Sequence, residues 1–318
     1  MEKFGWLYVG SGNIAKQTAR SISRGNHRIV AVYGRTRAKV EEFAKAHNAR
    51  AYTDFDTAVL SQGVDAVYIA TPHTSHLQYA KRAMELGKSV LCEKPVGTSE
   101  KEVLELIAAA KENDVYFCEA MWTWFSDVAL KVKEWVQSSK TGKIKKVHID
   151  YKFPGVMMPK TSRVRMPETA GGALLDIGIY PITYCYNLFG KPSGINCKGK
   201  LRDGIDINET VTLHYDGFDC VLDIGIDGLK ESCKITGEKG KITLGMFHMA
   251  RVAKFIGKEN ETFEGRTNYL TEFTRVADEI KQGKKESDYV PFEATLECMK
   301  IMDECRRQMG LVYPFEKQ

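Results

Sequence analysis

The sequence lacks any pair of cysteines at metal-binding or redox spacing, although it contains eight cysteines. No Cys-x-x-Cys occurs, and the thiols stand mostly among apolar residues. Zinc cages and thioredoxin-like motifs need cysteines close together in the chain, and disulfide frameworks are typical of small secreted proteins. We therefore expect reduced, buried thiols and no metal site.

Long apolar runs are also missing. No stretch of 18 apolar residues occurs, which argues against a membrane-spanning helix. The first four residues enter a strand-like pattern directly, without the basic and apolar regions of a signal peptide. We expect a cytoplasmic protein that has no membrane partner.

Neither sign of charge dominates the composition. The net charge is +5, from 46 Lys and Arg against 41 Asp and Glu. The densest basic run, residues 140–146, contains four lysines and is typical of a solvated loop. So small and scattered an excess predicts no nucleic-acid partner. With 318 residues, 43% of them hydrophobic, the chain is long enough for two domains.

A strand, a glycine turn and a helix follow one another near the start. The apolar residues 4–9 run into the sequence GSGNIA, and a helix-compatible segment continues to about residue 23. Glycines permit the tight turn, and the N–H groups at a helix start bind a pyrophosphate. This order predicts a dinucleotide site rather than a glycine-rich hairpin. The predicted contacts are Gly10, Ser11, Gly12, Asn13, Ile14 and Ala15.

The second strand, residues 28–33, ends without an acidic residue. An acid there would bind the ribose 2′-hydroxyl of NAD, whereas an arginine accepts the 2′-phosphate of NADP. Arg35, assisted by Thr36 and Arg37, therefore predicts NADP. A solvated arginine with use of both NADP and NAD is the alternative.

Strand and helix patterns then alternate. Strands at residues 66–70, within 89–95 and at 115–119 are separated by helices at 75–86 and 100–113. This alternation predicts a doubly wound parallel sheet, which binds its ligands at the carboxyl ends of the strands. The polar residues and prolines expected at those ends are Thr71, Pro72, His73, His76, Glu93 and Lys94. The alternatives are a polar turn for the two histidines and a solvated turn for the lysine.

A different pattern follows residue 122. A helix to about residue 138 leads into long strands at 145–152, 208–215, 219–226, 231–236 and 241–244, with glycine and aspartate turns between them. This spacing predicts a large, mainly antiparallel open sheet, and helices at 267–282 and 292–309 complete the chain. We expect a Rossmann domain at 1–121 and an α+β domain at 122–318. An apolar face of the open sheet would need a cover, which a homodimer or homotetramer supplies.

Asp176 and Tyr180 stand four residues apart in the sequence GGALLDIGIYP, a spacing that places two side chains on one helix face. Pro181 complicates a regular helix. A tyrosine is a poor base at neutral pH unless a nearby cation favours its phenolate. Lys94 and a cationic nicotinamide would supply that charge, with Glu93 orienting Lys94 or reaching the ribose. Core packing of Tyr180 is the alternative.

Together, the turn at 10–15, the Thr71-Pro72-x-x-x-His76 motif and Glu93-Lys94-Pro95 resemble the Gfo/Idh/MocA oxidoreductase family, over nearly the whole chain. Tyr180 in the later signature, with EAMWT at 119–123, resembles the branch of dimeric dihydrodiol dehydrogenase and NADP-dependent D-xylose dehydrogenase. The resemblance implies Lys94 and Tyr180 as the catalytic pair, Asp176 as a substrate contact, and dimer contacts through the open sheet.

The departures from the branch concern the substrate. Trp124 replaces a usual arginine, and His73 replaces an asparagine found in many members. Trp122 and Trp124 are candidates for stacking on a sugar, and Arg163 for a polar contact, although such aromatic residues are as often core. We expect a sugar, polyol or cyclic diol as the small-molecule substrate. A redox-neutral epimerase or glycosidase and a non-catalytic nucleotide sensor are the alternatives.

Overall fold

The computed structural model describes residues 3–316, which form two compact units. The first unit comprises the chain up to Trp122 together with Asn268–Thr295. The second comprises Thr123–Thr267 together with the chain from Leu296 onward. The expected domain boundary after residue 121 stays a prediction. That expectation did not include Asn268–Thr295 in the first unit.

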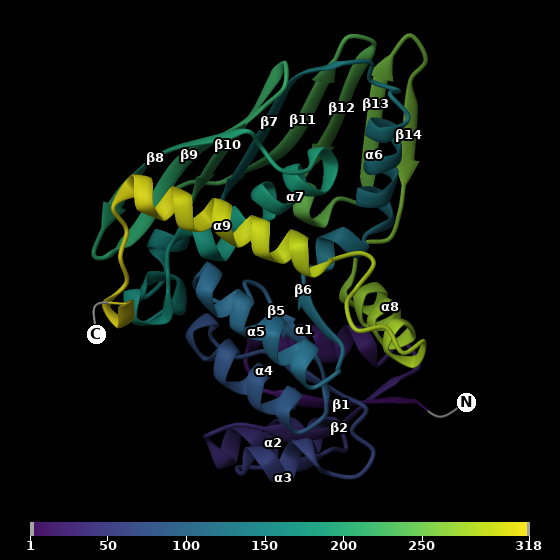
Figure 1. Ribbon diagram of the computed structural model, residues 1–318, viewed down its shortest axis with the longest axis vertical. Coiled ribbons are helices and arrows are strands. Elements are labelled where there is room, and N and C mark those ends of the chain that lie inside the picture. The colour runs from purple at the N-terminus through teal and green to yellow at the C-terminus, as the bar shows by residue number, and fades with distance from the viewer. Residues whose placement is uncertain (1–2, 317–318) are drawn as a thin grey trace. The chain divides into compact units, whose positions relative to one another are not determined.

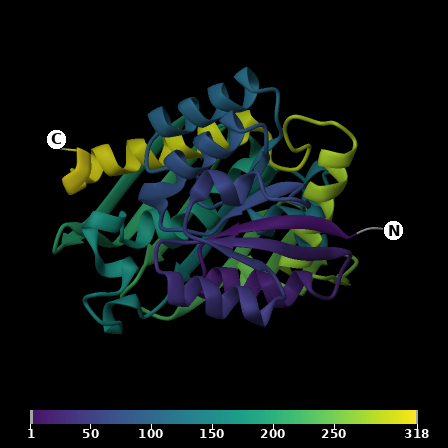
Figure 2. The same ribbon diagram turned by 90° about the horizontal axis from the view of Figure 1, so that it is seen from below.

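The first unit contains a six-stranded parallel sheet with helices on both sides (Figure 2). Its strand order is β3-β2-β1-β4-β5-β6. The strands are β1 (Phe4–Val9), β2 (His27–Tyr33), β3 (Arg50–Tyr52), β4 (Ala66–Ile69), β5 (Ser89–Glu93) and β6 (Phe117–Ala120). The helices are α1 (Asn13–Ile22), α2 (Arg37–Ala46), α3 (Phe55–Val59), α4 (His76–Glu85), α5 (Glu100–Glu112) and α8 (Tyr269–Lys281). The predicted doubly wound sheet is confirmed.

The core of the first unit explains why its strands read as continuous apolar runs. Every residue of β1 is buried, because helices cover both faces of a parallel sheet. Phe273 of α8 is fully buried against this sheet, with its ring centroid 4.8 Å from that of Trp6 and 4.9 Å from that of Tyr68. Helix α8, which follows the first segment of the second unit in sequence, therefore completes the core of the first unit.

The second unit is built on an eight-stranded sheet in the order β14-β13-β12-β11-β7-β10-β9-β8. All neighbours are antiparallel except β7 and β10, which are parallel. The strands are β7 (Ile144–Lys152), β8 (Gly194–Arg202), β9 (Ile205–Tyr215), β10 (Phe218–Gly225), β11 (Lys230–Gly237), β12 (Gly240–Gly245), β13 (Val252–Gly257) and β14 (Glu261–Glu264). The predicted mainly antiparallel sheet is confirmed.

Helices cover one face of this sheet, as Figure 1 shows for α6 (Asp127–Gln137), α7 (Ile179–Phe189) and the part of α9 (Phe292–Met309) that belongs to the unit. Residues that alternate along β7 show the two faces: Val147 and Ile149 are buried, whereas Lys146 is exposed and His148 half-buried. The open face carries mainly Lys, Thr, Ser and Asp on the central strands. The helices already cover the apolar face of the sheet, and the homodimer or homotetramer stays a prediction.

No described helix is both long enough and apolar enough to cross a membrane.

Candidate active site

The glycine turn after β1 has the geometry that close backbone approach requires. Gly10 has φ +106°, and a Cβ atom there would lie 2.7 Å from the carbonyl oxygen of Ala70. Gly12 is the N-cap residue of α1, and its position gives the helix no side-chain capping hydrogen bond. The first N–H groups of α1 are therefore available to the oxygens of a phosphate.

A pocket of about 900 Å³ opens in front of this turn. From the predicted cofactor set, Ile14, Ala15, Arg37, His73, His76, Glu93 and Lys94 are not among its lining residues. The predicted residues that line it are Gly10, Ser11, Gly12, Asn13, Arg35, Thr36, Thr71 and Pro72.

The pocket is more basic than the sequence analysis indicated. Lys16 and Arg20 of α1 and Lys39 of α2 line it beside Arg35. Lys16 and Arg20 stand four residues apart on one helix face, a spacing that could have identified them. Arg37, in contrast, is exposed, and its Nε lies 2.8 Å from Oε1 of Glu41. Four basic side chains therefore line the pocket, whereas Arg37 forms an ion pair with Glu41 on the surface.

His76 connects two loops at the carboxyl edge of the parallel sheet. Its Nδ1 lies 2.8 Å from the carbonyl oxygen of Pro95, and its Nε2 lies 2.8 Å from that of Thr71. The ring is completely buried. His76 therefore fixes the turn that contains Lys94 and Pro95 to the loop that lines the pocket, and His73, also buried, lies 5.8 Å from it between ring centroids.

Buried acids surround the strand that leads to Lys94. The hydroxyl of Tyr68 donates to Oε1 of Glu93 at 2.5 Å. Burial raises the pKa of Glu119 to about 7, although the N–H of Val96 and the charge of Lys94 lower it. Burial also raises the pKa of Glu272 well above its ordinary value, and Glu93 raises it further. Lys94 thus follows a strand end at which the pKa of Glu119 is about 7 and the pKa of the nearby Glu272 is raised by burial.

In the second unit, Asp176 and Tyr180 lie on a widened turn followed by a regular helix. Leu174–Gly178 form a π-helix, and α7 begins at Ile179. Pro181 has no N–H to donate, and its ring would clash with the carbonyl four residues before it, so the turn before it opens. The spacing of Asp176 and Tyr180 is therefore only approximately helical.

Polar contacts hold this segment on both sides. Nη2 of Arg163 donates to Oδ1 of Asp176 at 2.6 Å, which brings two of the predicted substrate contacts together. The N–H of Leu174 donates to the buried Oδ2 of Asp206 at 2.5 Å. Gly172 has φ +118°, and a Cβ atom there would lie 1.9 Å from Oδ1 of Asp206. Asp206 was not predicted, because its function depends on this contact across the fold.

The other predicted site residues lie in both units. Lys94 belongs to the first unit, and Asp176 and Tyr180 belong to the second. Trp122, in the first unit, is 6% exposed and packs on Tyr269 with ring centroids 5.0 Å apart. Trp124, in the second, is 4% exposed. Both tryptophans are therefore buried core residues, and their contact with a substrate stays a prediction.

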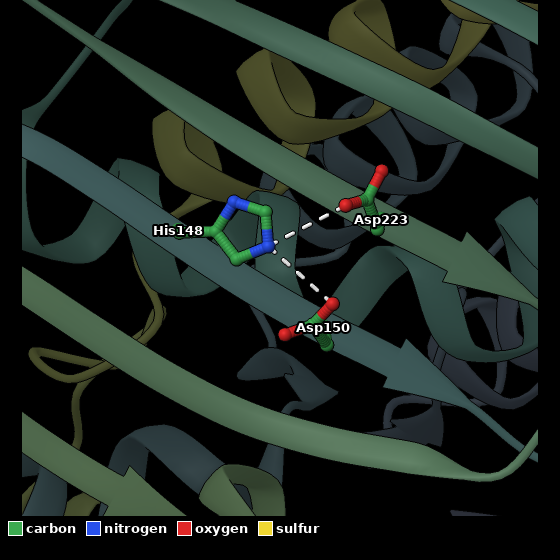
Figure 3. Close-up of side chains that lie close together, drawn as sticks. All are labelled: His148, Asp150 and Asp223. Carbon is green, nitrogen blue, oxygen red and sulfur yellow. Dashed lines mark hydrogen bonds and ion pairs between the residues drawn. The ribbon is translucent and has the colours of Figure 1, made fainter.

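One cluster on the open face of the large sheet has the composition of a metal site. Nε2 of His148 lies 3.4 Å from a carboxylate oxygen of Asp150 and 3.4 Å from one of Asp223 (Figure 3). Nζ of Lys230 lies 2.9 Å from Asp150, and Ser232 donates to it at 2.8 Å. Burial raises the pKa of Asp150, but these two contacts outweigh it and hold the pKa below its usual value. Since an ammonium group already neutralises Asp150, we assign no metal to this cluster.

Comparisons with known proteins cover both units. Residues 4–120 match the model of the Gfo/Idh/MocA oxidoreductase family, with an NAD-binding Rossmann fold, and residues 129–243 match the model of the Gfo/Idh/MocA C-terminal domain. The scyllo-inositol 2-dehydrogenase (NADP(+)) of Bacillus subtilis (strain 168) is 34% identical over 302 residues, which cover 91% of this chain and 92% of that protein. The trans-1,2-dihydrobenzene-1,2-diol dehydrogenase of Danio rerio is 30% identical over 334 residues, covering 98% and 99%.

Solved structures share the fold at lower sequence identity. The aldose-aldose oxidoreductase of Caulobacter crescentus, in complex with glycerol, has a TM-score of 0.88 at 20% identity and covers 96% of this chain and 97% of its own. A 3-ketoreductase of Actinomadura kijaniata, in complex with NADP and TDP-benzene, has a TM-score of 0.87 at 18% identity and covers 97% and 98%.

Proposed function

Because the chain belongs to the Gfo/Idh/MocA family of oxidoreductases, we propose that it is an NADP-dependent dehydrogenase. Its substrate is a secondary alcohol, or the corresponding carbonyl compound, of a sugar, polyol or cyclic diol. The sequence relatives support this class, since one is named for an inositol and NADP(+) and another for a cyclic diol.

The basic pocket of the first unit is the observation that carries the choice of cofactor. Arg35 lines it directly after β2, where an NAD-specific site would have an acid. Lys16, Arg20 and Lys39 add positive charge to the same pocket. NADP carries one phosphate more than NAD, so cations at this position favour NADP.

The chain's residues handle the proton and the substrate, while bound NADP accepts or supplies the hydride. Lys94 hydrogen-bonds the substrate oxygen and favours the phenolate form of Tyr180. Asp176, held by Arg163, accepts from a substrate hydroxyl. This division of roles requires Lys94 and Tyr180 to meet at one substrate, which is part of the proposal.

A substrate panel followed by NADPH absorbance tests the function. Aldoses, polyols, cyclic diols and dicarbonyls are each supplied with NADP or NADPH, and we expect net conversion of the cofactor with at least one class. Turnover without net change of the cofactor would instead support the redox-neutral epimerase or glycosidase. Binding of NADPH with no reaction on any compound would support a nucleotide sensor.

We also propose that the protein is cytoplasmic, binds no nucleic acid and forms a homodimer or homotetramer through the open face of the large sheet. The face carries both acids and lysines, such as Asp223 on β10 and Lys234 on β11, which flank β7. A second copy rotated by a two-fold axis could therefore match unlike charges. Light scattering measures the assembly. Asp223→Lys should weaken it, and a wild-type monomer would contradict it.

A further inference from the structure

Three polar side chains of the second unit form a hydrogen-bonded chain. Oε1 of Glu231 accepts from Nδ1 of His248 at 2.6 Å and from the backbone N–H of His248 at 2.9 Å. Nε2 of His248 lies 3.1 Å from the hydroxyl oxygen of Tyr151. The three residues come from β11, from the 3-10 turn Phe247–Met249 and from β7.

Strand register brings the two ends of this chain together. Tyr151 and Glu231 are directly paired between the antiparallel strands β7 and β11. Their side chains therefore share the helix-covered face of the sheet. His248 lies over that pair, and its ring stacks on Tyr151 with centroids 4.7 Å apart and planes 25° apart. Glu231 and His248 are only 12% and 14% exposed, so water competes little for these contacts.

The chemistry of the donors fixes the direction of each hydrogen bond. A carboxylate only accepts, so Nδ1 of His248 must carry a proton. In the neutral ring Nε2 then has the lone pair, and the hydroxyl of Tyr151 is its donor. The Tyr151 oxygen can therefore accept a proton from another group as its own proton passes to Nε2. The resulting imidazolium would face Glu231, as in the triads of hydrolases.

This chain lies beside Tyr180. The ring centroid of Tyr180 is 5.4 Å from that of His248 and 5.9 Å from that of Tyr151. Among the described residues, the titratable groups in these contacts with His248 are Glu231 on β11, Tyr151 on β7 and Tyr180 on α7. The arrangement therefore ends in a phenol next to the tyrosine assigned to the substrate.

We propose that Glu231, His248 and Tyr151 form a proton relay for alcohol oxidation, an inference that rests on the proposed dehydrogenase function. The substrate hydroxyl gives its proton to the phenolate of Tyr180. The Tyr180 hydroxyl passes that proton to the Tyr151 oxygen as the Tyr151 proton moves to Nε2 of His248. The substrate carbon gives its hydride to the nicotinamide, and its C–O bond becomes a carbonyl. Ketone reduction runs the same steps backwards. Tyr180 is the residue that contacts the substrate, and Tyr151, His248 and Glu231 act through it.

Two variants separate a relay from simple packing. Tyr151→Phe keeps the ring and removes the proton carrier. His248→Gln can still accept a hydrogen bond from Tyr151 but cannot take its proton. We expect each to lower kcat for alcohol oxidation by about 100-fold and to flatten the pH profile of kcat/KM. Activity and a pH profile within about twofold of the wild type in both would overturn the relay.

A matched control uses a phenol elsewhere in the unit. The Tyr215 hydroxyl donates to the carbonyl oxygen of Gly190 at 3.0 Å. Tyr215→Phe should leave both kcat and the pH profile unchanged. NADPH affinity and circular dichroism of all three variants show whether they remain folded. If Tyr151→Phe does not fold, the pH profile of kcat/KM for His248→Gln alone decides whether the relay operates.

A measurement without turnover separates failure of the relay from failure of the proposed function. In ¹⁵N-histidine-labelled protein at alkaline pH, with the His248 signals assigned from His248→Gln, we expect the Nδ1–H tautomer. An Nε2–H tautomer would overturn the relay even if no panel compound is oxidised. Absence of wild-type turnover with an Nδ1–H tautomer would count against the dehydrogenase function and support the hydrogen-bond directions of the relay.

Discussion

The backbone N–H of Val96 donates to Oε1 of the buried Glu119 at 3.2 Å, and this contact holds the turn that contains Lys94. Glu119 lies in β6, directly paired with Cys92 of the neighbouring β5. Burial raises its pKa to about 7. The anchor of the proposed catalytic lysine therefore changes its charge within the physiological pH range.

Glu119→Gln should change how stability depends on pH. The folded-state pKa of Glu119, about 7, lies above the ordinary glutamate value of 4.5. Its contribution to the free energy of unfolding is therefore full below pH 4.5 and is lost as the pH rises through 7. This loss amounts to about 3 kcal/mol at alkaline pH. Glutamine keeps an oxygen for Val96 and has no charge. Urea unfolding at pH 5 and pH 8.5 should show a smaller loss of stability in the variant.

The exposed Glu112 of α5 supplies the control, since Glu112→Gln should leave the pH dependence of the wild type unchanged. An equal alkaline loss of stability in wild type and Glu119→Gln would show that Glu119 does not cause it.

Arg35→Ala should weaken NADP binding while NAD binding changes little. Arg35 lines the cofactor pocket, and an arginine that contacts a phosphate contributes about 1.5–3 kcal/mol, so we expect a rise in the NADP dissociation constant of roughly 10- to 100-fold. Fluorescence titration with both nucleotides measures it. Arg37→Ala removes an arginine that pairs with Glu41 outside the pocket and should have no effect. Equal losses for NADP and NAD would contradict the assignment to the 2′-phosphate.

Lys94→Ala and Tyr180→Phe should each lower turnover by about 100-fold or more, because each removes a group that contacts the substrate oxygen. NADPH affinity should survive in both, since neither residue lines the cofactor pocket. Steady-state kinetics with the best panel substrate gives the comparison. The exposed Lys101 of α5 provides a control for loss of a lysine. Near-normal turnover in both variants would remove this pair from the mechanism.

Gly172→Ala should destabilise the second unit and displace the Asp176–Tyr180 segment. Gly172 has a positive φ, and the added Cβ would overlap with the Asp206 carboxylate, so we expect a loss of about 3 kcal/mol or more. Gly217→Ala is the matched control, because Gly217 has φ +80° with open space around it and should cost only about 1 kcal/mol. Thermal unfolding of both variants tests the difference, and equal losses would rule out the contact with Asp206 as the cause.

The sequence allowed prediction of the fold wherever burial left a clear pattern. β1 and β4 are buried along their whole length, so they read as apolar runs of strand length. β8 was missed because most of its residues are exposed at the edge of the sheet, and β14 because it is a short, polar edge strand. Edge strands depend on their neighbours for pairing, and a single sequence does not record that pairing.

The candidate site likewise contains features that the sequence predicts and features that it does not. The turn at Gly10 was predictable because local backbone geometry demands glycine there. The contacts among Tyr151, Glu231 and His248 were not predictable from the sequence. Strand register joins Tyr151 to Glu231, and the turn Phe247–Met249 brings His248 over that pair. The π-helix at Leu174–Gly178 was also not predicted, although Pro181 indicated that the helix would be irregular.

The position of α8 has a consequence for biosynthesis. Phe273 fills the core of the nucleotide-binding unit, yet the ribosome makes it only after all of Thr123–Thr267. At usual rates of translation, Phe273 is made on the order of ten seconds after the strands of this sheet. A gene fragment that stops at Trp122 would leave Trp6 and Tyr68 without it, so expression of the isolated amino-terminal half should yield aggregated chain unless α8 is fused to its end.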